Sequence, residues 1–164
     1  MENLRRVTLV FLVQKSSGQI TDVCLAMKKR GFGKGRWNGT GGKVEAGETV
    51  EAGARRETKE ELGVGLKDLN KVAELAFHFP YNPAFDQAVT AYISENWDGE
   101  PDESEEMKPD WFSVDEIPFE QMWPDDIFWL PEVLKGNLVR ASFVFGENDV
   151  VLKKEVSVVN NFSV

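Results

Sequence analysis

The chain has 164 residues, 41% of them hydrophobic and 29% charged, a composition that fits one globular domain over 1–164 and excludes a disordered or fibrous protein. Its 28 acidic residues outnumber the 19 basic ones, and the net charge of −9 argues against a partner that is a nucleic acid polymer. The single cysteine, Cys24, excludes a disulfide framework and favours a reducing compartment.

The first predicted element is a strand from Val7 to Val13, a nearly continuous run of apolar residues rich in β-branched side chains. Such a run is typical of a central strand covered on both faces. It is far shorter than the ~20 residues that span a bilayer, and no small-residue cleavage site follows it. We therefore expect a cytoplasmic protein with no membrane partner, acting as a monomer.

A hairpin is expected next, because the turn residues Ser16 to Gly18 separate the first strand from a second one at Val23 to Met27. Seven glycines then fall between Gly31 and Gly47. This density is unsuited to regular structure and predicts a loop whose backbone closely approaches another group.

A helix is predicted over 50–62, where Val50, Ala54, Thr58 and Leu62 recur at steps of four and Gly63 marks the end. The sequence after Gly63 predicts five further elements. They are strands at 72–79 and 89–93, an acidic loop at 98–106, a second helix from Pro124 toward Gly136 that Pro131 kinks or breaks, and a hairpin of 141–145 with 150–159. The economical architecture is an α/β fold, with a mixed β-sheet and one helix on each side.

Three carboxylates share one face of the first predicted helix, because Glu57, Glu60 and Glu61 stand at i, i+3 and i+4. Like charges this close repel each other unless a cation neutralises them. Oxygen ligands without nearby His or Cys favour Mg²⁺, with Mn²⁺ as an alternative. The competing interpretation is a solvated acidic helix face.

The charged positions of this stretch follow the pattern G-x5-E-x7-R-E-U-x-E-E-x-G-U. Its matching residues are Gly42, Glu48, Arg56, Glu57, Glu60, Glu61, Gly63 and Val64, and only Thr58 departs from it, at an aliphatic position. The chain thus resembles the Nudix hydrolases. The resemblance implies an α/β/α sandwich in which divalent ions bind the diphosphate of a nucleotide. The departure at Thr58 is expected to loosen a packing contact.

The resemblance also implies roles for these residues. The metal ligands would be Glu57, Glu60 and Glu61, with the carbonyl of Gly41 or Gly42. Glu48 and Arg56 would pair to brace the loop against the helix, which places Arg56 in the catalytic apparatus.

Groups outside the helix are also candidates for the phosphate end of the site. Glu106 is a candidate for a further ligand or a general base, with Glu105 as the alternative and a solvated loop as the competing interpretation. Lys28 and Lys43 could contact phosphates as point charges.

Three further runs, MKKRGFGKGRWNG at 27–39, EMKPDWF at 106–112 and IPFEQMWPDDIFW at 117–129, narrow the resemblance. They are similar to those of animal oxidised-purine nucleoside triphosphatases, whereas residues 80 to 88 depart from them. By this resemblance the base pocket would contain Asn38, Trp123, Asp125 and Asp126. The implied reaction converts 8-oxo-dGTP and oxidised dATP to monophosphates and pyrophosphate, which sanitises the nucleotide pool.

Purine recognition needs stacking surfaces and a few polar groups on the base edge. The aromatic walls could come from Trp123 and three phenylalanines, Phe32, Phe77 and Phe79. Thr8 completes the predicted substrate-binding residues. His78 should face away from its two neighbours and remain a surface residue.

The adjacent acids Asp125 and Asp126 repel each other, so one pKa should rise and one carboxyl should hold a proton near neutral pH. The protonated acid would donate to O6 of guanine while its neighbour accepts from N1–H. The competing interpretation is that both acids merely start a helix. Two other functions also stay open, which are hydrolysis of another nucleoside diphosphate derivative and nucleotide binding without turnover.

Overall fold

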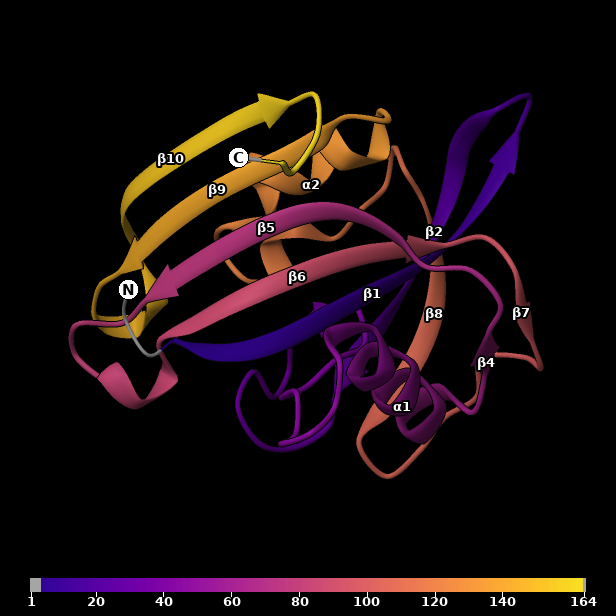
Figure 1. Ribbon diagram of the computed structural model, residues 1–164, viewed down its shortest axis with the longest axis horizontal. Helices are drawn as coiled ribbons and strands as arrows, with labels where there is room; N and C mark the ends of the chain where they lie inside the picture. The colour runs from indigo at the N-terminus through magenta and orange to yellow at the C-terminus, as the bar shows by residue number, and fades with distance from the viewer. Residues whose placement is uncertain (1–3, 164) are drawn as a thin grey trace.

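The computed structural model describes residues 4–163 and contains one large mixed sheet (Figure 1). Its strand order is β10-β9-β5-β6-β1-β2-β3, and β8 pairs with residues 22–28 of β2 along the edge opposite to β1 and β3. The strands are β1 (Arg5–Ser16), β2 (Gln19–Lys28), β3 (Trp37–Asn38), β5 (Asn70–His78), β6 (Gln87–Ser94), β8 (Met107–Ser113), β9 (Leu138–Phe145) and β10 (Val151–Val159).

The remaining elements connect or cover this sheet. Two helices, α1 (Val50–Leu62) and α2 (Asp126–Leu134), accompany a small sheet of β4 (Gly65–Leu66) and β7 (Trp97–Asp98). Single turns of 3-10 helix lie at η1 (Pro83–Phe85), η2 (Phe119–Gln121) and η3 (Glu147–Asp149).

The predicted central strand is confirmed, since β1 lies between β6, to which it is parallel, and β2, to which it is antiparallel. Side chains on both of its faces are buried, with Val10 and Leu12 1% exposed and Phe11 0% exposed. β5 runs parallel to β9 and antiparallel to β6. The sheet is therefore mixed, as expected.

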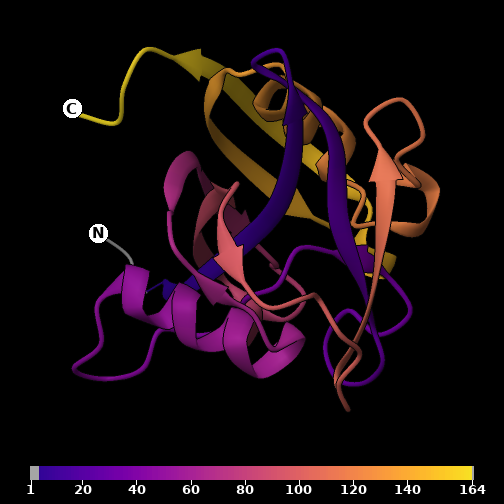
Figure 2. The same cartoon turned by 90° about the vertical axis from the view of Figure 1, so that its right-hand side faces the viewer.

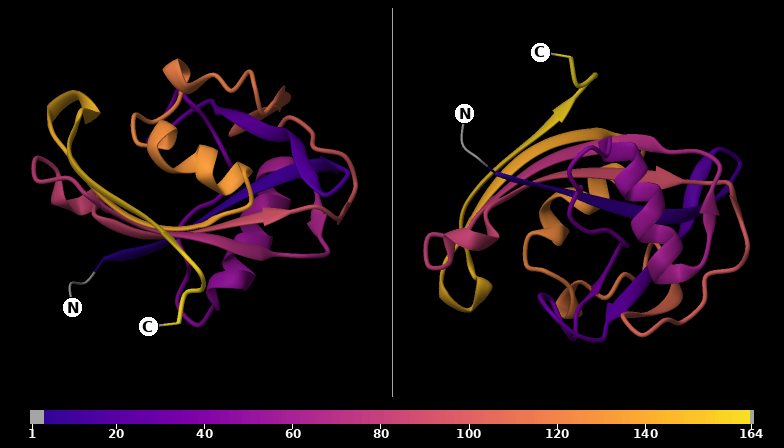
Figure 3. Two further views of the ribbon diagram at one scale, coloured as in Figure 1. Left: turned by 90° about the horizontal axis from the view of Figure 1, so that it is seen from above. Right: turned by 60° about the horizontal axis from the view of Figure 1, so that its bottom comes forward.

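The two helices cover opposite faces of the sheet, as the view from above in Figure 3 shows. Alternate residues of β1 enter different core clusters because strand side chains point to alternate faces. Phe11 packs in the cluster that contains Trp129 of α2, whereas Val10 and Leu12 pack in the cluster that contains Ala54 of α1. The predicted layered α/β arrangement is confirmed.

Helix α1 has the predicted bounds because both of its ends are capped. The Thr49 side chain accepts a hydrogen bond from the N–H of Ala52 at 3.0 Å, which satisfies one donor of the first turn. Gly63 ends the helix at φ 76°. These caps fix where the helix carboxylates lie relative to the loop before it.

The predicted break at Pro131 is wrong, because α2 stays helical through Pro131 to Leu134. A proline removes one backbone donor, and in this short helix burial of its apolar residues compensates for that loss. Trp129 and Leu130 are 0% exposed. Within residues 4–163, neither this helix nor any other is long and apolar enough to cross a membrane.

Strand β8 was not predicted, and it pairs antiparallel with β2 over Met107–Ser113 (Figure 2). Lys108, Pro109 and Asp110 make its sequence polar and interrupted. Proline is tolerated in a strand at the edge of a sheet, where its missing N–H is not needed for the ladder. Pairing with β2 therefore overrides the weak local preference of this segment.

Candidate active site

A cavity of about 330 Å³ lies against the face of the sheet that α2 covers, and its volume is within the range of small-molecule sites. Strands β1, β5, β6 and β9 form one side, and the loop after β2 and the segment before α2 form the other. All nine predicted substrate-binding residues line it. They are Thr8, Lys28, Phe32, Asn38, Phe77, Phe79, Trp123, Asp125 and Asp126, and both Gly41 and Gly42 also reach it.

Aromatic rings form much of the wall. Phe32 stacks on Phe85 with centroids 4.2 Å apart and lies 4.9 Å from Trp123, while Phe79 stacks on Phe145 at 4.8 Å. Sequence reasoning missed Phe85 and Phe145. Phe145 ends a predicted strand and shares its face with Phe143, an alternation that could have identified it. Phe85 lies in the segment that departs from the animal sequences.

The Asp125 and Asp126 side chains are each 2% exposed. The indole N–H of Trp129 donates to Oδ2 of Asp125 at 2.8 Å, and Asp125 makes no side-chain capping bond to the helix that follows. Oδ2 of Asp126 is buried and has no hydrogen-bond partner within residues 4–163. Such an orphaned atom is rare, and its position at a cavity favours ligand binding over helix capping.

Burial raises the pKa of both acids. It raises the pKa of Asp125 to about 6, although the bond from Trp129 opposes the shift. It raises the pKa of Asp126 well above the ordinary value, and the charge of Asp125 adds to the effect. The pair therefore holds a proton near neutral pH, and we assign that proton to Asp126 because Asp125 accepts the bond from Trp129.

Two other predicted residues present different polar groups. Oδ1 of Asn38 accepts from the N–H of Gly39 at 2.8 Å, so its NH₂ group remains as a donor for a ligand. The N–H and hydroxyl of Thr8 instead donate to the carbonyl of Gly42, at 2.9 and 3.4 Å. Thr8 thus lines the cavity while its hydroxyl binds the glycine loop.

Four cationic side chains line the same cavity in a chain of net charge −9. Lys28 and Lys43 were predicted as phosphate contacts, whereas Arg5 and Arg36 were not. Nothing in the sequence around either arginine indicated a role in binding. The cations create a local field that favours an anionic ligand despite the overall charge.

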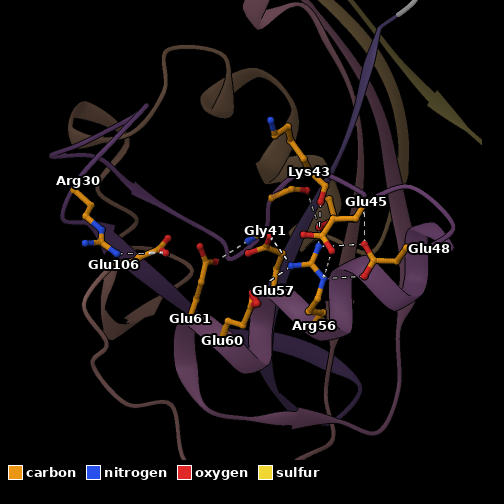
Figure 4. A network of polar contacts seen from close by, with 12 residues as sticks. Arg30, Gly41, Lys43, Glu45, Glu48, Arg56, Glu57, Glu60, Glu61 and Glu106 are labelled. Atoms are coloured by element: carbon orange, nitrogen blue, oxygen red, sulfur yellow. Dashed lines mark hydrogen bonds and ion pairs between the residues drawn. The ribbon is translucent and has the colours of Figure 1, made fainter.

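The predicted carboxylates lie along α1, and Figure 4 shows that they bond to two different partners. Glu57 and Glu60 accept from Arg56 at 3.1 and 3.2 Å, whereas Glu61 accepts from the N–H of Gly41 at 2.9 Å. Within residues 4–163, no three His, Cys, Asp or Glu side chains are gathered as a metal site. The helix that carries the three carboxylates is confirmed, but two of them pair with Arg56 and the third bonds to the glycine loop.

Glu61 is a buried acid, 2% exposed, and burial raises its pKa to about 8. The charges of Glu57 and Glu106 contribute to that rise. Burial also raises the pKa of Glu57, against the effect of Arg56. A cation near these groups would stabilise their ionised forms.

Of the two acids considered in the 103–106 loop, Glu106 is the better placed. Its charge raises the pKa of both Glu57 and Glu61. Its side chain is 45% exposed, against 87% for Glu105, and both lie near Arg30.

The brace between Glu48 and Arg56 is present. Arg56 donates to both carboxylate oxygens of Glu48, at 2.7 and 3.1 Å, and to the carbonyl of Lys43 at 3.1 Å. The hydrogen bonds from Arg56 hold the pKa of Glu48 down at about 2. This two-pronged pair fixes the loop against α1.

The residues fit a hard divalent cation. A Cβ at Gly42 would lie 2.4 Å from Oε2 of Glu57, so a larger residue there would push this carboxylate away from the loop. All the donors are oxygens, as Mg²⁺ prefers. Since the carbonyl of Gly42 already accepts from Thr8, the carbonyl of Gly41 is the better candidate ligand.

The departure at Thr58 brings a hydrogen bond that was not predicted. This side chain is 0% exposed, and its hydroxyl lies 2.9 Å from that of Thr40. A buried hydroxyl with a partner avoids the desolvation cost of an unpaired one. A specific hydrogen bond to the glycine loop thus takes the place of an aliphatic contact.

Comparison with known proteins agrees with this arrangement. Residues 3–133 match the family model described as NUDIX domain. The chain is 43% identical over 162 residues to the oxidized purine nucleoside triphosphate hydrolase of Mus musculus, which covers 99% of this chain and 100% of the mouse protein. The Danio rerio protein of the same name is 43% identical over 155 residues, covering 94% of this chain and 96% of its own.

A solved structure is similar over nearly the same extent. The crystal structure of a mutator MutT protein from Bacillus halodurans superposes with a TM-score of 0.79 at 26% identity, covering 94% of this chain and 98% of the other.

Proposed function

Because the chain belongs to the Nudix family, we propose that it hydrolyses oxidised purine nucleoside triphosphates, such as 8-oxo-dGTP and oxidised dATP, to monophosphates and pyrophosphate. The observation that carries this proposal is the buried pair Asp125 and Asp126 in an aromatic cavity whose lining includes Gly41, which donates to Glu61 of α1. The names of the mouse and zebrafish relatives support the same substrate class. The reaction would remove damaged nucleotides from the pool.

The Asp pair can bind a purine edge as both donor and acceptor. Protonated Asp126 donates to O6 of the base, while ionised Asp125 accepts from N1–H. Asn38 adds a donor, and the rings of Trp123, Phe32, Phe77 and Phe79 supply stacking surface. Because the pair can redistribute its proton, it can also accept an adenine-type edge.

The phosphate end of the substrate meets a second set of groups. Mg²⁺, or Mn²⁺ in its place, would be held by Glu57, Glu60, Glu61 and Glu106 with the carbonyl of Gly41 or Gly42. When bound, it offsets phosphate charge and lowers the pKa of a coordinated water. Lys28 contributes positive charge near Glu61, whose pKa it lowers. Arg56 holds the glutamates and the loop in register through Glu48.

The chain itself supports the remaining parts of the proposal. One chain supplies both the cavity lining and the carboxylates, which supports a monomer and one hydrolase domain over 1–164. The net charge of −9 disfavours a nucleic acid polymer as substrate. A buried free cysteine fits a reducing compartment such as the cytoplasm.

The test is hydrolysis of a nucleotide panel with Mg²⁺, scored by release of monophosphate and pyrophosphate. We expect kcat/KM for 8-oxo-dGTP to exceed that for dGTP at low substrate concentration. Equal values would contradict sanitation, and activity confined to ADP-ribose would contradict triphosphate hydrolysis as well. Glu61→Gln is the control for turnover and should lose several orders of magnitude in rate while remaining folded.

A further inference from the structure

The cavity wall contains a contact between segments far apart in the sequence. The guanidinium of Arg36, from the loop after β2, lies 4.1 Å from the ring centroid of Trp123. Its Nη1 donates to Oδ2 of Asp149, in the turn between β9 and β10, at 3.1 Å. The three side chains join the cavity wall to the C-terminal hairpin.

The backbone on both sides holds these groups in place. Gly33, at φ +87°, lies so close to the indole that a Cβ there would be 3.3 Å from Nε1 of Trp123. On the hairpin side, Asn148 and Asp149 adopt φ of 60° and 61°. Left-handed backbone is unusual for residues other than glycine and is maintained where the surroundings fix it.

Arginine suits this position for a physical reason. Its planar guanidinium can lie over an indole while its edge donates to a carboxylate, whereas the lysine ammonium is a compact point charge. The pair is also shielded, since the Arg36 and Asp149 side chains are 27% and 36% exposed. The charge of Arg36 further lowers the pKa of Asp125 against the effect of burial.

We propose that Arg36 is a specificity-determining positioning residue, which Asp149 orients so that its guanidinium fixes the Trp123 ring at the wall of the purine cavity. The turn of the C-terminal hairpin thereby takes part in substrate selection. The expected effect on kinetics rests on the proposed function. The contact between Arg36 and Trp123 can be tested without turnover.

The test without turnover follows the indole N–H resonance of Trp123 in ¹H–¹⁵N spectra, assigned with Trp123→Phe. Arg36→Gln and Asp149→Gly should both move this resonance in the same direction. Glycine suits the left-handed backbone at 149, so Asn148→Gly is the matched control for the turn. Lys34→Gln is the control for charge in the loop, and both controls should leave the resonance unchanged. An unmoved resonance in Arg36→Gln would overturn the proposal.

The kinetic test separates KM from kcat on 8-oxo-dGTP. Arg36→Gln should raise KM roughly 5- to 10-fold with kcat within about twofold, since a partly desolvated cation–π contact is of that order. Asp149→Gly should raise KM less, and the double variant should equal Arg36→Gln because both act through one contact. Arg36→Lys should recover only part of the loss.

Additive effects of the two substitutions, or full recovery by Arg36→Lys, would contradict a planar stack oriented by Asp149. If the unsubstituted protein does not hydrolyse 8-oxo-dGTP, the proposed function fails, while the Trp123 resonance still decides whether the contact exists.

Discussion

The indole N–H of Trp129 donates to Oδ2 of Asp125 at 2.8 Å, inside a core where Trp129 is 0% exposed. This one hydrogen bond connects the packing of α2 to the ionisation of the base pocket. A donor to a carboxylate favours its ionised form, so the bond opposes the rise in the pKa of Asp125 that burial causes.

Trp129→Phe should therefore raise the pKa of Asp125 above about 6. A rise of about one pKa unit, from about 6 to about 7, would lower the ionised fraction of Asp125 at pH 7 from roughly 0.9 to roughly 0.5, so kcat/KM for 8-oxo-dGTP should fall about twofold at pH 7 and about tenfold at pH 5. The loss should shrink at pH 9. The measurement is kcat/KM between pH 5 and 9, with Trp97→Phe, remote from the cavity, as the control. If kcat/KM falls at the same acidic pH in Trp129→Phe and in Trp97→Phe, the hydrogen bond from Trp129 does not set the ionisation of Asp125.

The second prediction concerns the cost of keeping Asp126 buried. Its folded pKa lies well above 3.8, so the folded state binds a proton that the unfolded state releases. Stability should therefore fall as the pH rises above ~4, where an unfolded Asp ionises, and the loss should continue through the folded pKa. Asp126→Asn should flatten this dependence and weaken purine binding, without lowering the Tm at pH 8.

Thermal unfolding from pH 4 to pH 8 and calorimetric binding of 8-oxo-dGMP measure the two effects. Asp115→Asn is a suitable control, because Asp115 is an exposed acid away from the cavity. A Tm at pH 8 well below that of the unsubstituted protein would mean that Asp126 stabilises the fold, which contradicts a group retained for ligand binding.

Sequence patterns predicted α1 to the residue, because its apolar steps of four and Gly63 are local signals. They failed for β8, whose polar residues and Pro109 form a strand only through pairing with β2. Arg36 had no local signal either, since Asp149, its partner, lies 113 residues away along the chain. The acidic face of α1 was predictable from spacing. The pairing of Arg56 with Glu60 was missed, although their i,i+4 spacing on the predicted helix is a local signal.

The third prediction concerns metal binding at Glu61. Its pKa of about 8 means that the metal-free protein carries a proton there at pH 7. Binding of Mg²⁺ should release this proton, so affinity should increase from pH 6 to pH 8. Calorimetry in buffers of different ionisation enthalpy measures the proton count. Glu61→Gln should abolish the release and weaken Mg²⁺ binding, whereas Glu51→Gln, exposed at the start of α1, should change neither. Proton release that persists in Glu61→Gln would assign the proton to another group.

The last prediction concerns the hydroxyls of Thr40 and Thr58, which lie 2.9 Å apart and join the glycine loop to α1. Both residues are buried, at 2% and 0% exposed. Thr40→Val keeps the shape but removes the hydroxyl partner of Thr58, so the remaining buried hydroxyl should destabilise the protein by about 1–3 kcal/mol. Thr58→Val should cost less, about 1 kcal/mol, because the hydroxyl of Thr40 also donates to the carbonyl of Val10 at 3.5 Å.

The double variant should be nearly as stable as the unsubstituted protein, because replacing both partners with apolar groups leaves nothing unsatisfied. Urea unfolding of all four proteins gives the coupling free energy, which we expect to be about 1 kcal/mol or more. Since both residues flank the loop that carries Gly41 and Gly42, kcat of the double variant reports whether the bond also positions the loop. Losses of stability that simply add would show that the two hydroxyls do not stabilise each other, and that Thr58 is tolerated at an aliphatic position for its size alone.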